Sequence, residues 1–268
     1  MTLAQLTQRL ASGGIANAET DARLLLCHFF EISPAQLYED PSRSFESEAL
    51  SLALARRLAR EPLQYILGEV AFFEELYEVS ADCLIPRSDT ELLVEHAIKH
   101  LPRGIRFADL GTGSGCIAIS VLSHRPDLCA VAADISQGAL SLASRNARKN
   151  GVSDRFSPVL TDMRAPDPSL FEGVSAILSN PPYIARGVLK TLERELCFEP
   201  RLALDGGEDG LDFYRAILDS FDVPLYLFEI GFDQGAALTA LALSHGLFAE
   251  IYKDFGGCDR LAVLKRTV

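Results

Sequence analysis

The spacing of apolar residues divides the chain into a helical part and a longer part in which strands and helices alternate. Before residue 67, apolar side chains recur at helical spacing, notably over residues 17–30 and 46–60. Thr2 is placed to cap the first of these helices. The sequence therefore predicts a small N-terminal helical bundle at residues 1–66.

Residues 67–86 have a different pattern. Two short alternating runs, around Phe72 and around Tyr77, are typical of a β-hairpin. We expect this hairpin to link the bundle to the rest of the chain. Ser88 then stands where it would cap a helix over residues 89–100.

From residue 105 onward, apolar runs that indicate strands alternate with amphipathic segments that indicate helices. Strands are expected at 105–110, 128–133, 156–160, 174–179 and 223–230, and helices at 115–123, 137–150, 209–220 and 234–244. Residues 248–254 and 260–265 fit a closing antiparallel pair. This alternation predicts an α/β domain with a parallel sheet covered by helices on both faces.

A glycine-rich loop, Gly111-Thr112-Gly113-Ser114-Gly115, follows the first strand of this domain and opens a helix. Gly111 permits a tight turn, Gly113 lets a ligand approach the backbone, and Gly115 allows the helix to start close by. Asp134 stands 23 residues after Gly111, at the end of the next strand. A carboxylate there accepts hydrogen bonds from a ribose hydroxyl pair, so the pattern predicts a nucleotide-like ligand.

The spacing of the loop narrows the choice of ligand. A dinucleotide-binding loop would have glycine at position 116, where this chain has Cys116. The observed spacing suits S-adenosylmethionine, whose amino-acid end lies over the loop. Asp109 would then lie near the ammonium group of the ligand or cap the turn, and both roles stay open.

A second motif, Asn180-Pro181-Pro182-Tyr183, directly follows the apolar run 174–178. The two prolines remove backbone donors and end the strand, and each residue before a proline is held extended. The Asn180 side-chain oxygen and the Pro181 carbonyl are then acceptors free of strand pairing, and the Tyr183 ring is available to lie against a planar group.

Two such acceptors suit a planar NH2 group. If they grip both N–H bonds, the nitrogen is biased toward tetrahedral shape and its lone pair becomes available to attack a sulfonium methyl group, with catalysis by positioning and oriented dipoles. The glycine loop ends the first strand and Asn180 ends the fourth, and in a doubly wound sheet these strands flank the point where strand order reverses. The sequence therefore predicts that methyl donor and acceptor meet there.

Charge and composition exclude several classes of protein. The chain has 25 Lys and Arg against 37 Asp and Glu, a net charge of −12, so direct binding of DNA is not expected. No uncharged apolar run approaches the roughly 18 residues of a membrane helix, and the N-terminus lacks the pattern of a secretory signal. We therefore expect a cytoplasmic protein that does not bind a membrane.

Cysteine and histidine spacing gives no sign of a disulfide framework or a metal site. The six cysteines are scattered without a CxxC pair, and the five histidines show no HExxH spacing. We expect reduced, mostly buried thiols and no metal.

The two motifs together resemble those of class I methyltransferases that modify amino or amide nitrogen. The resemblance becomes more specific when further segments are included, because they resemble the HemK/PrmC family of glutamine N5-methyltransferases. These segments are 61–68, 84–91, 198–204, 229–231 and 257–260. The resemblance implies a Rossmann-like, S-adenosylmethionine-dependent methyltransferase domain at 87–268. The helical bundle at 1–66 would be a substrate-docking domain and the hairpin at 67–86 a linker.

The resemblance also implies site residues. The residues that would contact S-adenosylmethionine are Gly111, Thr112, Gly113, Ser114, Gly115, Asp134, Met163 and Asn180. The residues that would hold the substrate are Asn180, Pro181, Pro182 and Tyr183, of which Asn180, Pro181 and Tyr183 would be catalytic. The protein substrates would be peptide chain release factors, methylated on the amide nitrogen of the glutamine in a Gly-Gly-Gln loop, with S-adenosylhomocysteine as product.

The chain departs from the family pattern at two positions. Ser88 stands where the family often has proline, and Met163 stands where it sometimes has tryptophan. Met163 would either stack less tightly on adenine or fill the core. Arg87, Glu199 and Arg201 would act in the site or form ordinary ion pairs, and Glu229, on an apolar strand, is expected to make a buried hydrogen bond.

Alternative functions stay open on the sequence. A ribosomal-protein glutamine would use the same chemistry, and a DNA adenine-N6 methyltransferase shares a motif of the Asn-Pro-Pro-Tyr type but would need a basic cleft. A non-enzymatic scaffold that binds the cofactor and recruits a partner is a third possibility. The acidic, apolar-striped helical bundle is either simply packed or a docking face for a macromolecule.

Overall fold

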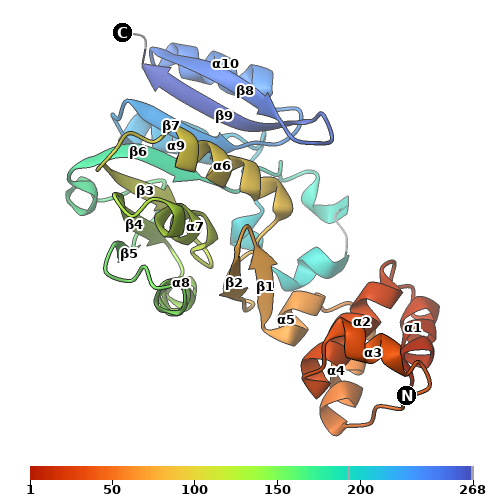
Figure 1. Ribbon diagram of the computed structural model, residues 1–268. Coiled ribbons are helices and arrows are strands. Elements are labelled where there is room, and N and C mark those ends of the chain that lie inside the picture. The colour runs from red at the N-terminus through yellow and green to blue at the C-terminus, as the bar shows by residue number, and fades with distance from the viewer. Residues whose placement is uncertain (192–193, 267–268) are drawn as a thin grey trace. The chain divides into compact units, whose positions relative to one another are not determined.

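The computed structural model describes residues 1–191 and 194–266 (Figure 1). These residues divide into two compact units, a helical unit of residues 1–69 with 194–198, and an α/β unit of residues 70–191 with 199–266. Each unit has its own hydrophobic core. No helix in the described residues is long and apolar enough to cross a membrane.

The helical unit is built from short amphipathic helices, as the sequence predicts. Its helices are α1 (Leu3–Ser12), α2 (Ala18–Phe30), α3 (Pro34–Glu39), α4 (Glu48–Leu58) and α5 (Leu63–Leu67). Thr2 caps α1 in a reciprocal capping box with Gln5. Arg57 pairs with the buried Asp21 at 2.7 Å and with Glu195 at 3.5 Å, which joins the 3-10 helix Arg194–Phe198 to this unit.

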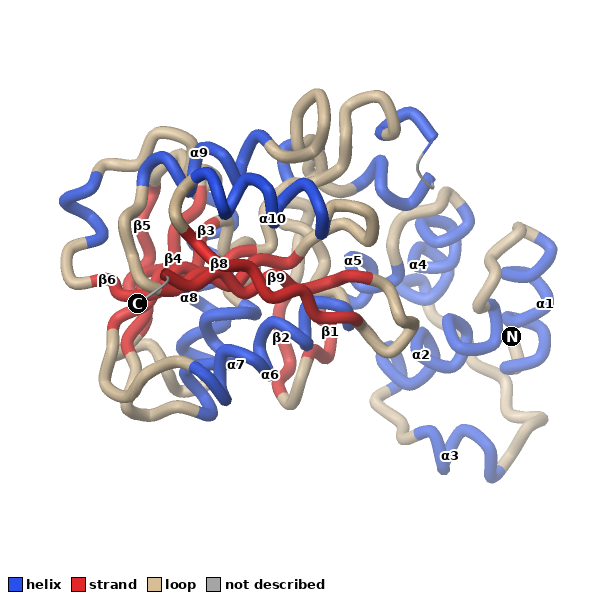
Figure 2. Tube along the Cα trace, turned by 90° about the horizontal axis from the view of Figure 1, so that it is seen from above, coloured by secondary structure: helices blue, strands red, loops and turns tan. Residues whose placement is uncertain are grey.

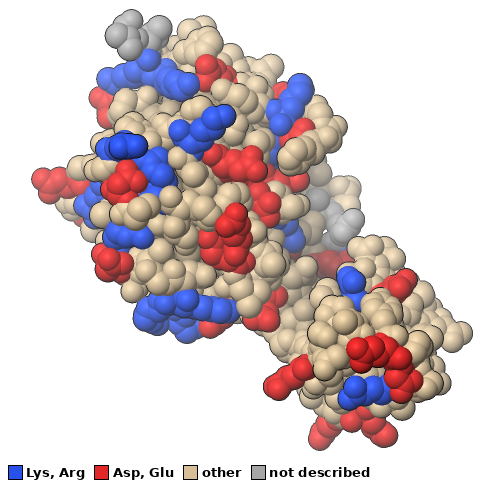
Figure 3. Space-filling view, in the orientation of Figure 1, with Lys and Arg blue, Asp and Glu red and all other residues tan. Residues whose placement is uncertain are grey.

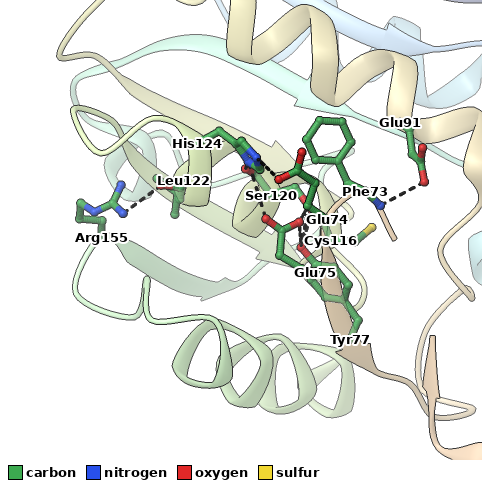
Figure 4. Close-up of polar contacts among 10 residues, drawn as sticks. All are labelled: Phe73, Glu74, Glu75, Tyr77, Glu91, Cys116, Ser120, Leu122, His124 and Arg155. Carbon is green, nitrogen blue, oxygen red and sulfur yellow. Dashed lines mark hydrogen bonds and ion pairs between the residues drawn. The ribbon is translucent and has the colours of Figure 1, made fainter. Parts of the chain in front are cut away.

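The predicted hairpin forms from β1 (Glu69–Phe72) and β2 (Glu75–Glu78) and packs against α7 (Cys116–His124) of the α/β unit. Figure 4 shows the contact: the Tyr77 hydroxyl lies 2.7 Å from Ser120 Oγ, which in turn donates to Glu75 Oε2 at 2.7 Å. Tyr77 is fully buried, so this polar contact sits inside the core.

The α/β unit contains a seven-stranded sheet with the order β5-β4-β3-β6-β7-β9-β8. The strands are β3 (Arg106–Leu110), β4 (Cys129–Asp134), β5 (Phe156–Leu160), β6 (Val174–Ser179), β7 (Leu225–Glu229), β8 (Leu247–Lys253) and β9 (Asp259–Arg266). Strands β3 to β7 pair in parallel, and β9 is antiparallel to both β7 and β8. The predicted α/β fold and its antiparallel closing pair are confirmed.

Helices cover both faces of this sheet (Figure 2). Helices α6 (Glu91–His100), α7 and α8 (Gln137–Lys149) pack on one face, and α9 (Asp212–Ser220) and α10 (Gly235–Ser244) pack on the other. Strand order reverses between β3 and β6, which are neighbours although two strands separate them in the sequence. The predicted switch point is therefore confirmed.

Two local predictions are wrong. Ser88 does not cap the helix that follows, because residues Ser88–Thr90 form a 3-10 turn that runs directly into α6. The cysteine side chains are not mostly buried: Cys83 and Cys116 are buried, whereas Cys129, Cys197 and Cys258 are exposed. Cys129 begins β4 and Cys258 lies in the turn between β8 and β9, where the chain faces solvent.

Candidate functional site

A cavity of about 530 Å³ in the α/β unit is bordered by the carboxyl ends of β3, β4 and β6. Predicted site residues that line it are Gly111, Thr112, Gly113, Ser114, Asp134, Met163, Asn180 and Pro182. Gly115, Pro181 and Tyr183 are the predicted residues that do not line it. The tertiary structure thus brings the glycine loop and the Asn180 segment to the same cavity.

The glycine loop is held in shape by the neighbouring strand. The backbone nitrogens of Gly111 and Thr112 both donate to the Ala133 carbonyl, at 2.8 and 2.9 Å. Gly111 has φ +72°, and an added Cβ there would lie 2.7 Å from Met163 Cε. A side chain at Gly111 would therefore fill the space between the loop and Met163.

Gly115 does not line the cavity and instead affects how the helix that follows the glycine loop packs. Its φ is +85°, and an added Cβ would lie 2.7 Å from Ile119 Cδ1 and 3.2 Å from Ala143 Cβ. The glycine therefore lets the start of α7 pack closely against α8, as its place in the motif predicts.

Asp134 joins the second strand to the glycine loop. Its Oδ2 accepts from the Gly113 nitrogen at 2.9 Å, and its Oδ1 accepts from the Ser136 nitrogen at 2.9 Å. Burial raises the pKa of Asp134, although these backbone hydrogen bonds lower it. A carboxylate that lines a cavity at the end of β4 is placed to accept hydrogen bonds from hydroxyl groups.

Asp109 caps the turn and does not line the cavity. It is fully buried, and its Oδ2 accepts from Thr112 Oγ1 at 2.7 Å and from the Ala118 nitrogen at 3.2 Å. Burial raises its pKa to about 7. The turn-capping role is thus formed by Oδ2, while Oδ1 is buried and has no hydrogen-bond partner among the described residues, so the role toward an ammonium group stays a prediction.

The Asn180-Pro181-Pro182-Tyr183 segment leaves β6 at the cavity. The Asn180 Nδ2 donates to Thr90 Oγ1 at 3.2 Å, while within the described residues its Oδ1 accepts no hydrogen bond. Pro181 and Pro182 are buried. Tyr183 packs on the core behind the cavity, with its hydroxyl 3.2 Å from Glu229 Oε1.

Glu229 makes the buried hydrogen bonds expected of it. Besides Tyr183, it accepts from Thr90 Oγ1 at 2.5 Å. Burial raises its pKa to about 7, against the opposing effect of these two hydrogen bonds. Thr90, in contrast, was not identified from the sequence, because nothing in the local pattern places it beside residues about 90 and 140 positions away.

Asn146 is another contributor that sequence reasoning missed. It is fully buried on α8, and its Nδ2 donates to the carbonyls of Ser114 and Glu78, at 2.9 and 3.0 Å. It thereby ties the glycine loop to the hairpin. Its position on the otherwise apolar face of α8, with Ala139 and Leu142, was the available signal.

Glu199 organises the wall of the cavity. Its Oε2 accepts from the Ile85 nitrogen at 3.0 Å and its Oε1 pairs with Arg87. Arg87 lines the cavity, whereas Arg201 does not and is exposed. Glu199 therefore holds Arg87 at the rim.

The charged residues around the cavity are more acidic than basic. Its acidic residues are Asp82, Asp134, Asp162, Asp205 and Asp212, and its basic residues are Arg87, Arg164 and Arg186. This balance favours a cationic ligand. Within residues 1–191 and 194–266, no three His, Cys, Asp or Glu side chains gather as a metal-binding group.

On the face seen in Figure 3, basic side chains of the α/β unit are interspersed with acidic ones. No continuous basic stripe, as a duplex-DNA binder would present, runs across this face of the described residues.

Two family models match the sequence. The first, described as PrmC N-terminal domain, matches residues 2–68. The second, described as Methyltransferase small domain, matches residues 87–205 and so includes the glycine loop, Asp134, Met163 and the Asn180 segment.

Relatives match over nearly the whole chain. A release factor glutamine methyltransferase of Cereibacter sphaeroides is 41% identical over 263 residues, which cover 94% of this chain and 93% of that protein. One of Nitratidesulfovibrio vulgaris is 37% identical over 276 residues, covering 97% and 92%. The crystal structure of the hMettl16 catalytic domain in complex with MAT2A 3′UTR hairpin 1 has a TM-score of 0.57 at 17% identity and covers 82% of this chain and 81% of that one, which shows a shared fold.

Proposed function

Because the chain belongs to the family of release factor glutamine methyltransferases, we propose that it transfers a methyl group to the side-chain amide nitrogen (N5) of a glutamine. The substrate is the glutamine of the Gly-Gly-Gln motif in peptide chain release factors. The methyl donor is S-adenosylmethionine, and S-adenosylhomocysteine is the product. The observation that carries the proposal is that the glycine loop and the Asn180 amide border one cavity at the switch point of the sheet.

The cavity fits the donor by the space and the polar groups that it offers. Gly111 leaves room that a Cβ would fill, and Asp134 presents a carboxylate suited to the two ribose hydroxyls. Thr112, Gly113, Ser114 and Met163 complete the wall on this side, and Gly115 supports the loop from behind. When bound, S-adenosylmethionine supplies an electrophilic methyl group on a positively charged sulfur, which suits the excess of carboxylates around the cavity.

The Asn180 segment then holds the substrate amide. In this proposal Asn180 Oδ1, which borders the cavity, accepts one N–H bond of the glutamine, and the Pro181 carbonyl, which is not part of the cavity lining, accepts the second when the substrate is bound. Pro182 and Tyr183 fix the backbone that carries these two acceptors. The amide nitrogen forms the new C–N bond as the sulfur–methyl bond breaks, and the nitrogen gives up one proton to water. Positioning and oriented dipoles supply the rate enhancement, so no residue needs to form a covalent bond.

The helical unit serves in this proposal as the docking domain for the release factor. It matches the PrmC N-terminal model, and its exposed surface includes Glu39 and Glu46. We expect the hairpin region to link it to the methyltransferase domain, with residues 1–66, 67–86 and 87–268 as the three parts. Reversing the charge of Glu39 and Glu46 should raise KM for full-length release factor and leave kcat unchanged. Unchanged KM would make the unit purely structural.

Methyl transfer from labelled S-adenosylmethionine tests the function. Label should enter full-length release factor and should be lost when its Gly-Gly-Gln glutamine is replaced by alanine. Mass spectrometry should place one added CH2 on that glutamine. Label on a ribosomal protein alone, on DNA, or on no macromolecule would refute the proposal in favour of a different substrate or of a non-enzymatic scaffold.

A further inference from the structure

A chain of hydrogen bonds lies behind Asn180 and connects it to a buried carboxylate. Asn180 Nδ2 lies 3.2 Å from Thr90 Oγ1, Thr90 Oγ1 lies 2.5 Å from Glu229 Oε2, and the Tyr183 hydroxyl lies 3.2 Å from Glu229 Oε1. Thr90 and Glu229 are each only 2% exposed. Asn180 and Thr90 line the cavity. Glu229 does not line it and is joined to it through its hydrogen bond with Thr90.

The chemistry of these groups sets the direction of the hydrogen bonds. An ionised carboxylate can only accept, so both hydroxyl groups that contact Glu229 must donate to it. Thr90 has a single hydroxyl hydrogen, and this hydrogen is committed to Glu229. Toward Asn180, the Thr90 oxygen can therefore only accept, which requires the amide nitrogen of Asn180 to face Thr90.

The orientation of the Asn180 amide decides what the cavity presents. With Nδ2 on Thr90, Oδ1 is directed away from Thr90 and is available as an acceptor for a substrate NH2 group. If the amide were rotated by half a turn, it would present its own NH2 donor to the NH2 donor of the substrate. The two orientations have nearly the same shape, so packing alone selects between them weakly.

We propose that Thr90 and Glu229 are positioning residues for methyl transfer, with the acceptor-only carboxylate of Glu229 fixing the Asn180 amide so that its oxygen faces the substrate. The inference rests on the proposed function, since an amide substrate is what makes this orientation matter. A protonated Glu229 would lose the constraint, because its O–H could donate to Thr90. Thr90 would then be free to donate to Asn180 Oδ1, and the amide would turn.

The groups around Glu229 determine the pH range in which its carboxylate becomes protonated. The titratable and charged groups that face it are Asp89 beside Thr90, Cys116 of α7, Tyr183 after β6, Tyr214 of α9 and Arg260 of β9. Arg260 is itself shared with Asp89 at 3.2 Å and Asp254 at 3.1 Å, so it only partly offsets the burial of Glu229. Burial therefore dominates and raises the pKa of Glu229 to about 7, so turnover should fall as the pH drops below that value.

The test compares four proteins: wild type, Thr90→Val, Thr90→Ser and Glu229→Gln. For each, kcat and KM for full-length release factor are measured at saturating S-adenosylmethionine between pH 5.5 and 9, and cofactor affinity is measured by calorimetry. Thr90→Val and Glu229→Gln should lower kcat about ten-fold or more with cofactor affinity unchanged. Thr90→Ser keeps the hydroxyl and should stay within about three-fold of wild type. The decline of kcat below pH about 7 should persist in Thr90→Ser and vanish in Glu229→Gln.

Matched controls separate positioning from folding. Thr239→Val removes a threonine hydroxyl on α10 that donates to the Gly235 carbonyl, and Glu250→Gln neutralises a glutamate paired with Lys265, away from the cavity. Neither should change kcat. Thermal unfolding identifies any variant that fails to fold, and Thr90→Ser and the pH profile of the wild type still test the inference if Thr90→Val does not fold.

The outcomes distinguish the failure of the positioning role of Thr90 and Glu229 from the failure of the proposed methyltransferase function. If the wild type methylates the release factor and both Thr90→Val and Glu229→Gln keep wild-type kcat with unchanged pH profiles, the positioning inference is overturned and the proposed function stands. The same holds if Thr90→Ser loses as much activity as Thr90→Val. If the wild type transfers no methyl group to the release factor, the proposed function fails and takes this inference with it.

Discussion

Asp134 accepts a hydrogen bond from the backbone nitrogen of Gly113, with 2.9 Å between Oδ2 and N. One carboxylate therefore both shapes the glycine loop and lines the cavity. Each carboxylate oxygen accepts more than one hydrogen bond, so the contact with Gly113 leaves capacity for a ligand hydroxyl. The ends of β3 and β4 thus act together as one binding surface.

Asp134→Ala should weaken the binding of S-adenosylmethionine by about 10-fold or more, because hydrogen bonds to a charged group contribute about 1.5–3 kcal/mol. Calorimetric titration with the cofactor measures the effect, and kcat at saturating cofactor should change little. Asp219→Ala, at an exposed position on α9 outside the cavity, is the matched control. An unchanged dissociation constant for Asp134→Ala would argue against the ribose role.

Asn180→Ala should cut kcat by about 10²-fold or more, because it removes a positioned acceptor that acts in the transition state. Cofactor affinity should stay nearly intact. Asn150→Ala, which removes a side chain that bonds the Asn146 carbonyl at the end of α8, should leave kcat unchanged. Lost cofactor affinity together with normal turnover would show that the role assigned to Asn180 is wrong.

Gly115→Ala should destabilise the α/β unit more than Gly151→Ala does. Both glycines have positive φ, +85° and +70°, so both substitutions incur a backbone cost of about 1–2 kcal/mol. At Gly151 an added Cβ meets nothing within 4 Å, whereas at Gly115 it meets Ile119 and Ala143. Overpacking should add about 1–3 kcal/mol at Gly115 alone. Denaturant unfolding of the two variants measures the difference, and equal losses would contradict the close packing of α7 on α8.

The stability of the wild type should depend on Glu229 between pH 5 and 8. Burial raises the pKa of Glu229 from 4.5 to about 7, so the folded protein holds this proton more tightly than the unfolded chain. The contribution of Glu229 to stability is therefore complete below pH about 4.5 and is lost as the pH rises through 7. Relative to wild type, Glu229→Gln should gain about 2–3 kcal/mol of unfolding free energy between pH 5 and pH 8. Denaturant unfolding of both proteins at these two pH values measures the gain. An equal difference in unfolding free energy between variant and wild type at both pH values would contradict the raised pKa.

Tyr77→Phe should destabilise the protein by about 1–2 kcal/mol without changing kcat, because it removes a buried hydroxyl that contacts Ser120 and the Cys116 carbonyl. Tyr38→Phe, at a half-exposed position in the helical unit, is the control and should be neutral. Thermal unfolding compares the two. A Tyr77→Phe variant as stable as wild type would show that apolar packing alone anchors the hairpin.

The local sequence was sufficient to predict a motif wherever the backbone conformation of that motif determines its chemistry. Glycines with positive φ at positions 111, 113 and 115 set the shape of the loop, and the prolines after Asn180 end β6 wherever the chain folds. The alternation of strand and helix fixed the α/β fold, and the rule for strand order placed both motifs at one switch point. The sequence also indicated a buried hydrogen-bonding role for Glu229, because this residue is a charged one in an apolar strand.

Tertiary structure alone decided how the side chains of these motifs are oriented. Thr90 reaches Asn180 and Glu229 because α6 and β7 pack together, and a hydrogen bond across 90 or 139 positions leaves no periodic trace in the sequence. The same holds for Asp109, whose carboxylate proves to cap its own turn, and for Asn146, which bonds the glycine loop from α8. Periodicity and turn chemistry report on a residue and its near neighbours, whereas the direction of a hydrogen bond in the core depends on which distant partner the fold supplies.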